Sequence, residues 1–248
     1  MTAHVELAHA KLTVSLRIIG VRDDGYHLID AEMVSLDLAD RLTFAEGDGL
    51  VLEGPAATGL VADDQNLVRR ALRAVGRQAH VQVDKQVPAG GGLGGGSSDA
   101  AAVLRWAGCD DLELAASLGA DVPFCVHGGR ARVTGIGEHL EPLPFEERSY
   151  TLVLPPFGCS TVAVYRAWDQ LGGPVGQHGN DLEPAALHVE PRLAEWRDRL
   201  GEDTGAQPRL AGSGSTWFVE GAHPGDGRLV VRTSAPNDVT EGGTAEES

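Results

Sequence analysis

The glycine-rich segment 88–98 constrains the fold of this chain more than any other part of its sequence. Six of the seven residues from Gly90 to Gly96 are glycines, and each loses much conformational freedom on folding, so a mere connection would not need them. Without side chains, backbone N–H groups can approach one anion closely. The Ala-rich run that follows predicts a helix whose positive end faces the same anion. The segment therefore predicts a phosphate-binding loop, with Ser97 or Ser98 as the helix cap.

Three other interpretations of this segment fit less well. The spacing is not the GxxxxGK[ST] of a Walker-type loop. Three of the glycines fit GxGxxG, with Asp110 or Asp111 about twenty residues on, as a dinucleotide site requires. However, the preceding strand carries Gln82, Asp84 and Lys85, whereas a central parallel strand is a continuous apolar run. The third interpretation, a flexible linker, fits poorly because a linker is rarely followed directly by an Ala-rich helix.

The rest of the chain alternates between strand-like and helix-like patterns. Period-two alternation predicts strands, and apolar residues at helical spacing predict helices. Strands are predicted at 12–18, 80–84, 130–134, 151–154, 216–220 and 228–233. Helices are predicted at 67–75, 98–106, 162–171 and 191–200. These elements follow no strict βαβ rhythm, which favours an α+β fold over a doubly wound sheet.

The chain length suits one large domain or two modest ones that share an interface. It has 248 residues, and the polar stretch around 146–149 precedes a strand that stops at Pro155 and Pro156. We place the boundary there, which gives domains at 1–148 and 149–234. Residues 235–248 are polar, acidic and glycine-rich, so we expect them to be disordered.

The charge and the cysteines limit the classes of partner. A formal net charge of −16 repels phosphate backbones and makes a nucleic-acid partner a poor choice. For a nucleotide to bind, backbone N–H groups, a lysine and a metal ion would have to offset the repulsion between its phosphates and this negative charge. No apolar run approaches the roughly 18 to 20 residues of a membrane span, and the first residues carry no secretory pattern. Cys109, Cys125 and Cys159 form no CxxC pair, so we expect reduced thiols in a cytoplasmic protein.

Separate segments of the chain, in the same order, resemble motifs of the GHMP kinases. PAGGGLGGGSSDAA at 88–101 resembles the second motif of that family. The other matching segments are AHAKL at 8–12, DGYH at 24–27, LGADVPF at 118–124, NDLEP at 180–184 and RLAGSGS at 209–215. Within the family, the chain is most similar to kinases that act on 4-diphosphocytidyl-2-C-methyl-D-erythritol. The resemblance implies an N-terminal ATP-binding domain of the ribosomal protein S5 domain 2-like type and a smaller α/β-sandwich C-terminal domain.

The resemblance also implies a reaction and the residues that perform it. The γ-phosphoryl of ATP would move to the 2-hydroxyl of the methylerythritol unit, a step of the non-mevalonate isoprenoid pathway. Asp121 would accept or orient the hydroxyl proton, and Lys11 would hold that hydroxyl and counter charge. Mg²⁺ would accompany ATP, with Ser98 (or Ser97) touching the metal or a phosphate. The ATP-binding residues would be Pro88, Ala89, Gly90, Gly91, Gly92, Leu93, Gly94, Gly95, Gly96, Ser97 and Ser98.

The acceptor residues follow from the same motifs. Tyr26 would stack on cytosine, His27 would hydrogen-bond its edge, and Tyr165 would cover its other face. Gly212 and Ser213 would form a second glycine turn near the acceptor. The chain departs from the family pattern at Thr13, where an asparagine is usual.

Two alternatives to this function stay open on the sequence. One is another GHMP kinase with a mevalonate-like or homoserine-like acceptor, although such acceptors carry no base to stack on Tyr26. The other is a non-catalytic homologue that binds a ligand, although a binder needs no carboxylate at Asp121. For the oligomeric state we expect a monomer or a weak homodimer.

Overall fold

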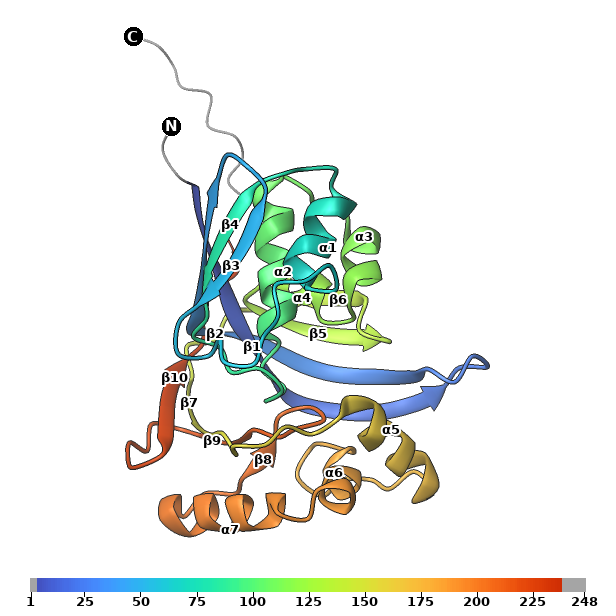
Figure 1. The fold of residues 1–248 in the computed structure, drawn as a ribbon. Coiled ribbons are helices and arrows are strands. Elements are labelled where there is room, and N and C mark those ends of the chain that lie inside the picture. The colour runs from blue at the N-terminus through green and yellow to red at the C-terminus, as the bar shows by residue number, and fades with distance from the viewer. Residues whose placement is uncertain (1–3, 238–248) are drawn as a thin grey trace.

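The computed structural model describes residues 4–237, and their N-terminal half is built on a six-stranded sheet (Figure 1). Its strands are β1 (His4–Val21), β2 (His27–Ala45), β3 (Gly49–Glu53), β4 (His80–Asp84), β5 (Arg130–Gly135) and β6 (His139–Pro142). The order is β3-β4-β2-β5-β6, with β1 also paired to β2. The β3–β4 pair is parallel, but β4 pairs with β2 in the antiparallel sense. This is no doubly wound parallel sheet, so the dinucleotide interpretation of the glycine segment is wrong.

Four helices cover one face of this sheet (Figure 1). They are α1 (Leu67–Ala74), α2 (Gly95–Trp106), α3 (Leu112–Leu118) and α4 (Val122–His127). The alternating residues Leu42 and Phe44 on β2 pack with Val81 and Val83 on β4 against buried residues 100–104 of α2. Burying this apolar face holds α2, and with it the glycine segment, at a fixed place beside β1 and β4.

The C-terminal half forms a smaller antiparallel sheet with its own helices. The strands, in the order β10-β7-β9-β8, are β7 (Ser149–Val153), β8 (Arg209–Leu210), β9 (Trp217–Glu220) and β10 (Arg228–Arg232). The helices are α5 (Thr161–Gln170), α6 (Glu183–Val189) and α7 (Leu193–Thr204). Trp217 is fully buried within the core of this half.

The long β1–β2 hairpin connects the two halves. Its outer part extends past the N-terminal helices and lies over α5 (Figure 1). There Leu16 and Ile29 join the core of the C-terminal half with Val164 of α5. Asp181 fixes the hairpin further, because its carboxylate accepts hydrogen bonds from Arg17 Nη1 at 2.6 Å and from the Ile18 N–H at 3.0 Å. The hairpin therefore forms one wall of any site between the halves.

The predicted α+β fold is confirmed, and each predicted strand and helix has a counterpart. The sequence patterns missed the strands β2, β3, β6 and β8 and the helices α3, α4 and α6. Of the predicted disordered tail, Asn237 donates its backbone N–H to the His127 carbonyl at 3.1 Å, and residues 238–248 lie outside the described residues. Among residues 4–237, no helix has both the length and the apolar character needed to cross a membrane.

Candidate active site

The glycine segment forms a tight loop between β4 and α2. The Leu93 carbonyl accepts the Lys11 backbone N–H at 2.9 Å, which ties the loop to β1. Gly94 has φ +71°, and a Cβ built on it would lie 2.7 Å from Lys11 Cγ. A side chain at Gly94 would therefore collide with the lysine that the sequence singles out. The first N–H groups of α2, which have no acceptor within the helix, begin at this loop.

The prediction that Ser97 or Ser98 caps α2 is wrong. The helix begins at Gly95, its N-cap is Gly94, and no side chain caps it. Ser97 and Ser98 instead lie in the first turn. The Ser98 hydroxyl donates to the His9 carbonyl at 2.7 Å, and the residue is only 1% exposed. Ser97 lines the cavity beside the loop and Ser98 does not, so this arrangement does not favour Ser98 as the metal ligand.

Lys11 and Asp121 form an ion pair at the start of α4. Lys11 Nζ lies 3.2 Å from Asp121 Oδ2 and donates to the Thr13 hydroxyl at 3.1 Å. The lysine side chain is 6% exposed, whereas that of the aspartate is 31% exposed. Asp121 is the N-cap residue of α4, yet its carboxylate makes no capping hydrogen bond. That carboxylate is therefore held by Lys11 on one side and open to a ligand on the other.

Two cavities meet at the glycine loop, and both are lined by Gly92 and Gly94. The first, here called the large cavity, has a volume of about 670 Å³ and is lined by Lys11 and Asp121. The second, the loop cavity, has a volume of about 280 Å³ and is lined by Pro88 to Gly90, Gly92 to Ser97 and the start of α1. A group bound in the loop cavity can thus reach a group bound in the large cavity beside the Lys11–Asp121 pair.

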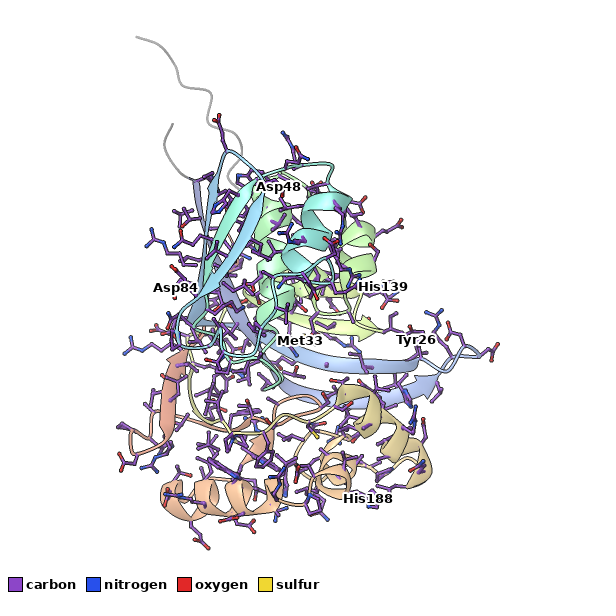
Figure 2. The ribbon with its side chains drawn as sticks, in the orientation of Figure 1. Tyr26, Met33, Asp48, Asp84, His139 and His188 are labelled. Atoms are coloured by element: carbon purple, nitrogen blue, oxygen red, sulfur yellow. The ribbon has the colours of Figure 1, made fainter. Side chains whose placement is uncertain are left out.

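The far end of the large cavity is aromatic. Tyr26, at the outer end of the β1–β2 hairpin (Figure 2), is 59% exposed and lines the cavity with His27 and Tyr165. The centroid of the His27 ring lies 4.8 Å from the centroid of the Tyr165 ring and 5.4 Å from that of the Trp168 ring. His27 Nε2 is 2.7 Å from Asp169 Oδ1. The structure therefore brings together all three aromatic residues that the sequence predicts for the acceptor.

The second glycine turn closes the large cavity between these two ends. Asn180 Nδ2 donates to the carbonyls of Leu210 at 2.8 Å and Gly212 at 2.6 Å, which fixes the turn. A Cβ on Gly212 would lie 4.0 Å from Lys11 Nζ. The Ser213 hydroxyl is 2.9 Å from that of Thr161 at the start of α5. Gly212 thus lies beside Lys11, and Ser213 lines the large cavity with it.

A buried cluster of charged residues, not predicted from the sequence, supports the loop. Lys85 Nζ donates to carboxylates of Asp40 and of Asp99, the latter at 2.6 Å. Asp40 Oδ1 also accepts the backbone N–H groups of Gln86 and Val87, which lead into the loop. Asp99 Oδ1 is buried without a hydrogen-bond partner among the described residues. Burial raises the pKa of Asp99 to about 7, against the opposing effect of the nearby Lys85.

Replacing Asp99 with asparagine is expected to change how stability depends on pH. The Asp99 pKa is 3.8 ordinarily and about 7 in the fold, so between these values the folded protein binds a proton that the unfolded chain releases. The stability that this proton confers is fully present below about pH 4 and is lost as the pH rises to about 7. The asparagine side chain of the variant does not titrate. As the pH rises through this window, the unfolding free energy of the wild type should therefore fall relative to that of D99N by roughly 1 kcal/mol per pH unit.

Urea denaturation of both proteins across that window checks this expectation. The exposed Asp198 on α7 provides a matched control, because D198N makes the same chemical change away from the loop. Parallel stability curves for the wild type and D99N would contradict the assignment of a raised pKa to Asp99.

Two polar residues of α5 that were not predicted from the sequence, Arg166 and Asp169, also line the large cavity. Asp169 could have been found from its helical spacing, because it lies one turn beyond Tyr165 on the same face of the helix. Arg166 directly follows Tyr165, so helical spacing gave no signal for it. The half-buried Tyr165 has its pKa raised to about 12, mainly by desolvation of the phenol and further by the nearby Asp121. Its phenol therefore stays protonated at neutral pH and can donate a hydrogen bond.

Known proteins match this chain along most of its length. A family model described as the GHMP kinases N terminal domain matches residues 66–129. A 4-diphosphocytidyl-2-C-methyl-D-erythritol kinase of Paracoccus denitrificans is 41% identical over 234 residues, which cover 86% of this chain and 85% of the relative. A relative with the same name from Pelotomaculum thermopropionicum is 39% identical over 254 residues, covering 86% and 87%.

Solved structures agree with these relatives. A crystal structure of 4-(cytidine 5'-diphospho)-2C-methyl-D-erythritol kinase is similar with a TM-score of 0.74 and 31% identity, covering 94% of this chain and 100% of that chain. The mevalonate kinase of L. major in complex with R-mevalonate shares the fold, with a TM-score of 0.64 at 14% identity and coverage of 95% and 97%. Because relatives of this name share 39–41% identity with the chain over 86% of its length, the chain belongs to the 4-diphosphocytidyl-2-C-methyl-D-erythritol kinase family of the GHMP kinases.

Proposed function

We propose that this protein transfers the γ-phosphoryl of ATP to the 2-hydroxyl of 4-diphosphocytidyl-2-C-methyl-D-erythritol in the methylerythritol phosphate pathway of isoprenoid synthesis. One observation carries the proposal: the Lys11–Asp121 pair lines the large cavity at the place where that cavity meets the loop cavity. ATP in the loop cavity would present its γ-phosphoryl to a hydroxyl held beside Asp121. Phosphoryl transfer needs mainly such positioning together with charge stabilisation.

Each residue of the pair has a separate task in this proposal. The Asp121 carboxylate accepts the proton of the attacking hydroxyl or orients it, since only one of its sides is engaged by Lys11. The Lys11 ammonium, buried and pinned to Thr13 at 3.1 Å, offsets negative charge as the phosphoryl moves. The N–H groups of the loop and the positive end of α2 hold the phosphates. The hydroxyl of Thr13 thus takes a place beside Lys11 where the family usually has an amide.

The residues beside the loop suit Mg²⁺ bound together with ATP. Within residues 4–237 there is no group of three histidine, cysteine or acidic side chains that would hold a metal alone. Mg²⁺ usually uses one or two protein oxygens, substrate phosphates and water. Ser97 lines the loop cavity, and a Cβ on Gly119, near Asp121, would lie 4.0 Å from its hydroxyl. We therefore assign the ligand role to Ser97; the ion would neutralise phosphate charge.

The aromatic end of the large cavity supports a cytidine-linked acceptor over a mevalonate-like or homoserine-like one. A base is held well between aromatic faces, and Tyr26 and Tyr165 both line this cavity. A purely ligand-binding homologue has no need of a carboxylate poised between two cavities. The assay is incubation with Mg-ATP and the cytidylyl acceptor, with ADP release measured beside phosphorus NMR of the product. No new phosphomonoester on the erythritol would contradict the proposal.

The proposal also covers the cellular compartment, the oligomeric state and the domain division of the enzyme. The free thiols Cys109, Cys125 and Cys159 are consistent with a reducing cytoplasm. We propose a monomer or weak homodimer, and a division of the chain into an ATP-binding domain, 1–148, and a C-terminal domain, 149–234. Sedimentation across a concentration series would measure the oligomeric state.

Tyr26→Ala is expected to weaken the acceptor far more than ATP. Removing the exposed ring deletes a stacking face worth roughly 1–3 kcal/mol per base, so the KM of the cytidylyl acceptor should rise by about tenfold to a hundredfold. The KM of ATP should stay nearly constant. Y26F, which keeps the ring, is the matched control and should resemble the wild type. An unchanged acceptor KM in Y26A would remove Tyr26 from the base site.

A further inference from the structure

Helix α5 runs along the large cavity from its reacting end to its aromatic end. Its first residue, Thr161, contacts Ser213 in the turn that lies beside Lys11. Asp169, in its last turn, contacts His27. At about 1.5 Å of rise per residue these two points are roughly 12 Å apart. Thr161, Tyr165, Arg166 and Asp169 all line the cavity, so the middle of α5 lies between the site of phosphoryl transfer and the site of the base.

Arg166 is the one arginine or lysine lining the large cavity, among the described residues, whose charge is not already engaged. Lys11, the other such cation, is buried and bound to Asp121 and Thr13. Arg166 is exposed and makes no hydrogen bond or ion pair with another residue of the described part of the chain. Asp121 and Asp169 give the cavity wall negative charge, in a protein of net charge −16.

An acceptor in which a diphosphate joins a base-bearing sugar to a polyol places its negative charges midway along this cavity. The polyol must reach Asp121, and the base must reach Tyr26 and the His27 ring, which the Tyr165 ring contacts from α5. The diphosphate therefore falls between these two ends, within reach of the long side chain of Arg166. A guanidinium group presents a planar fork of donors that matches phosphate oxygens. We propose that Arg166 is the residue that recognises the diphosphate of the acceptor and thereby selects diphosphate-linked acceptors; this inference rests on the proposed function.

The same geometry separates Arg166 from the ATP phosphates. The loop cavity, where the phosphates of ATP would lie, is lined by residues of β3, the glycine loop, α1 and α2, and not by Arg166. The Thr161 and Ser213 hydroxyls, 2.9 Å apart at the reacting end of α5, add neutral donors next to the proposed diphosphate position. Loss of the guanidinium should therefore affect the acceptor and leave ATP alone.

Calorimetric titration with cytidine 5'-diphosphate and with cytidine tests this inference without turnover. The wild type should bind the diphosphate more tightly than the nucleoside. In Arg166→Gln the affinity for the diphosphate should fall about tenfold, the size expected for one partly exposed charge-assisted contact, with the affinity for cytidine unchanged. Arg166→Lys should recover part of the preference. Arg199→Gln, the same change at an exposed position of α7, is the matched control and should keep the full preference.

The possible results have distinct meanings. An unchanged preference in R166Q, or equal losses for both probes, would overturn the role of Arg166. A rise in the KM of ATP instead of the acceptor KM would also overturn it. If the wild type shows no kinase activity but R166Q still loses the diphosphate preference, the recognition role holds and only the proposed reaction fails. Wild-type protein that binds neither probe would overturn both proposals.

Discussion

Asp121→Asn is expected to lower kcat by about a thousandfold, within the range that a general base or proton-orienting group contributes. Asparagine keeps the shape of the side chain but cannot take a proton at neutral pH, and it removes the negative partner 3.2 Å from Lys11 Nζ. The Thr13 hydroxyl still accepts from Lys11, so the lysine should keep its position. ATP lies mainly in the loop cavity, and its affinity, measured by calorimetry, should stay nearly unchanged.

The design separates a chemical role from a structural one. D198N, the same substitution on the exposed face of α7, should leave kcat unaltered. Lys11→Met should also lower kcat strongly, and the double variant should lose little more than D121N alone, because residues that act as a unit are not additive. Equal losses of ATP affinity and turnover in D121N would show that Asp121 shapes the site and does not act on the hydroxyl.

The glycine loop and the helix after it were predictable from the sequence because a dense glycine run is itself a distinctive signal. A glycine run before an Ala-rich helix has few uses besides binding an anion. The structure places this glycine run against Lys11. The pairing of Lys11 with Asp121 came from the family motifs and not from any local pattern, since a lysine near a strand start is ordinarily exposed. Only the fold brings residues that are distant in sequence to 3.2 Å.

Other parts of the site depend on tertiary contacts that no local pattern encodes. Lys85 looks like an ordinary strand-end lysine in the sequence, yet it is 2% exposed between Asp40 and Asp99. The prediction of a serine N-cap was wrong because Gly94, with φ +71°, occupies the N-cap position. Ser97 and Ser98 therefore lie inside the helix. The long strand β2 escaped detection because its burial alternates irregularly where it pairs with β1, β4 and β5.

The contact between the glycine loop and the second glycine turn leads to the other large expected effect. Gly92 has φ +78°, and a Cβ on it would lie 2.8 Å from the Ala211 carbonyl oxygen and 3.0 Å from that of Gly214. Both neighbours are backbone atoms that cannot rotate away. Because Gly92 lines both cavities, Gly92→Ala must push the loop and the turn apart at the place where ATP and acceptor meet.

Gly92→Ala is therefore expected to lower kcat/KM on the order of a hundredfold, the loss that follows from a displacement of about 1 Å between reacting groups. Gly90→Ala is the matched comparison in the same loop, because Gly90 also has a positive φ, +76°, but the nearest atom to its added Cβ would be Gly158 Cα at 3.8 Å. Its cost should be limited to backbone strain of about 1–2 kcal/mol in the unfolding free energy. If G90A lost as much activity as G92A, strain in the loop itself would explain both losses. A larger loss in G92A, at similar stability, would show that close packing of the loop on the turn aligns the two substrates.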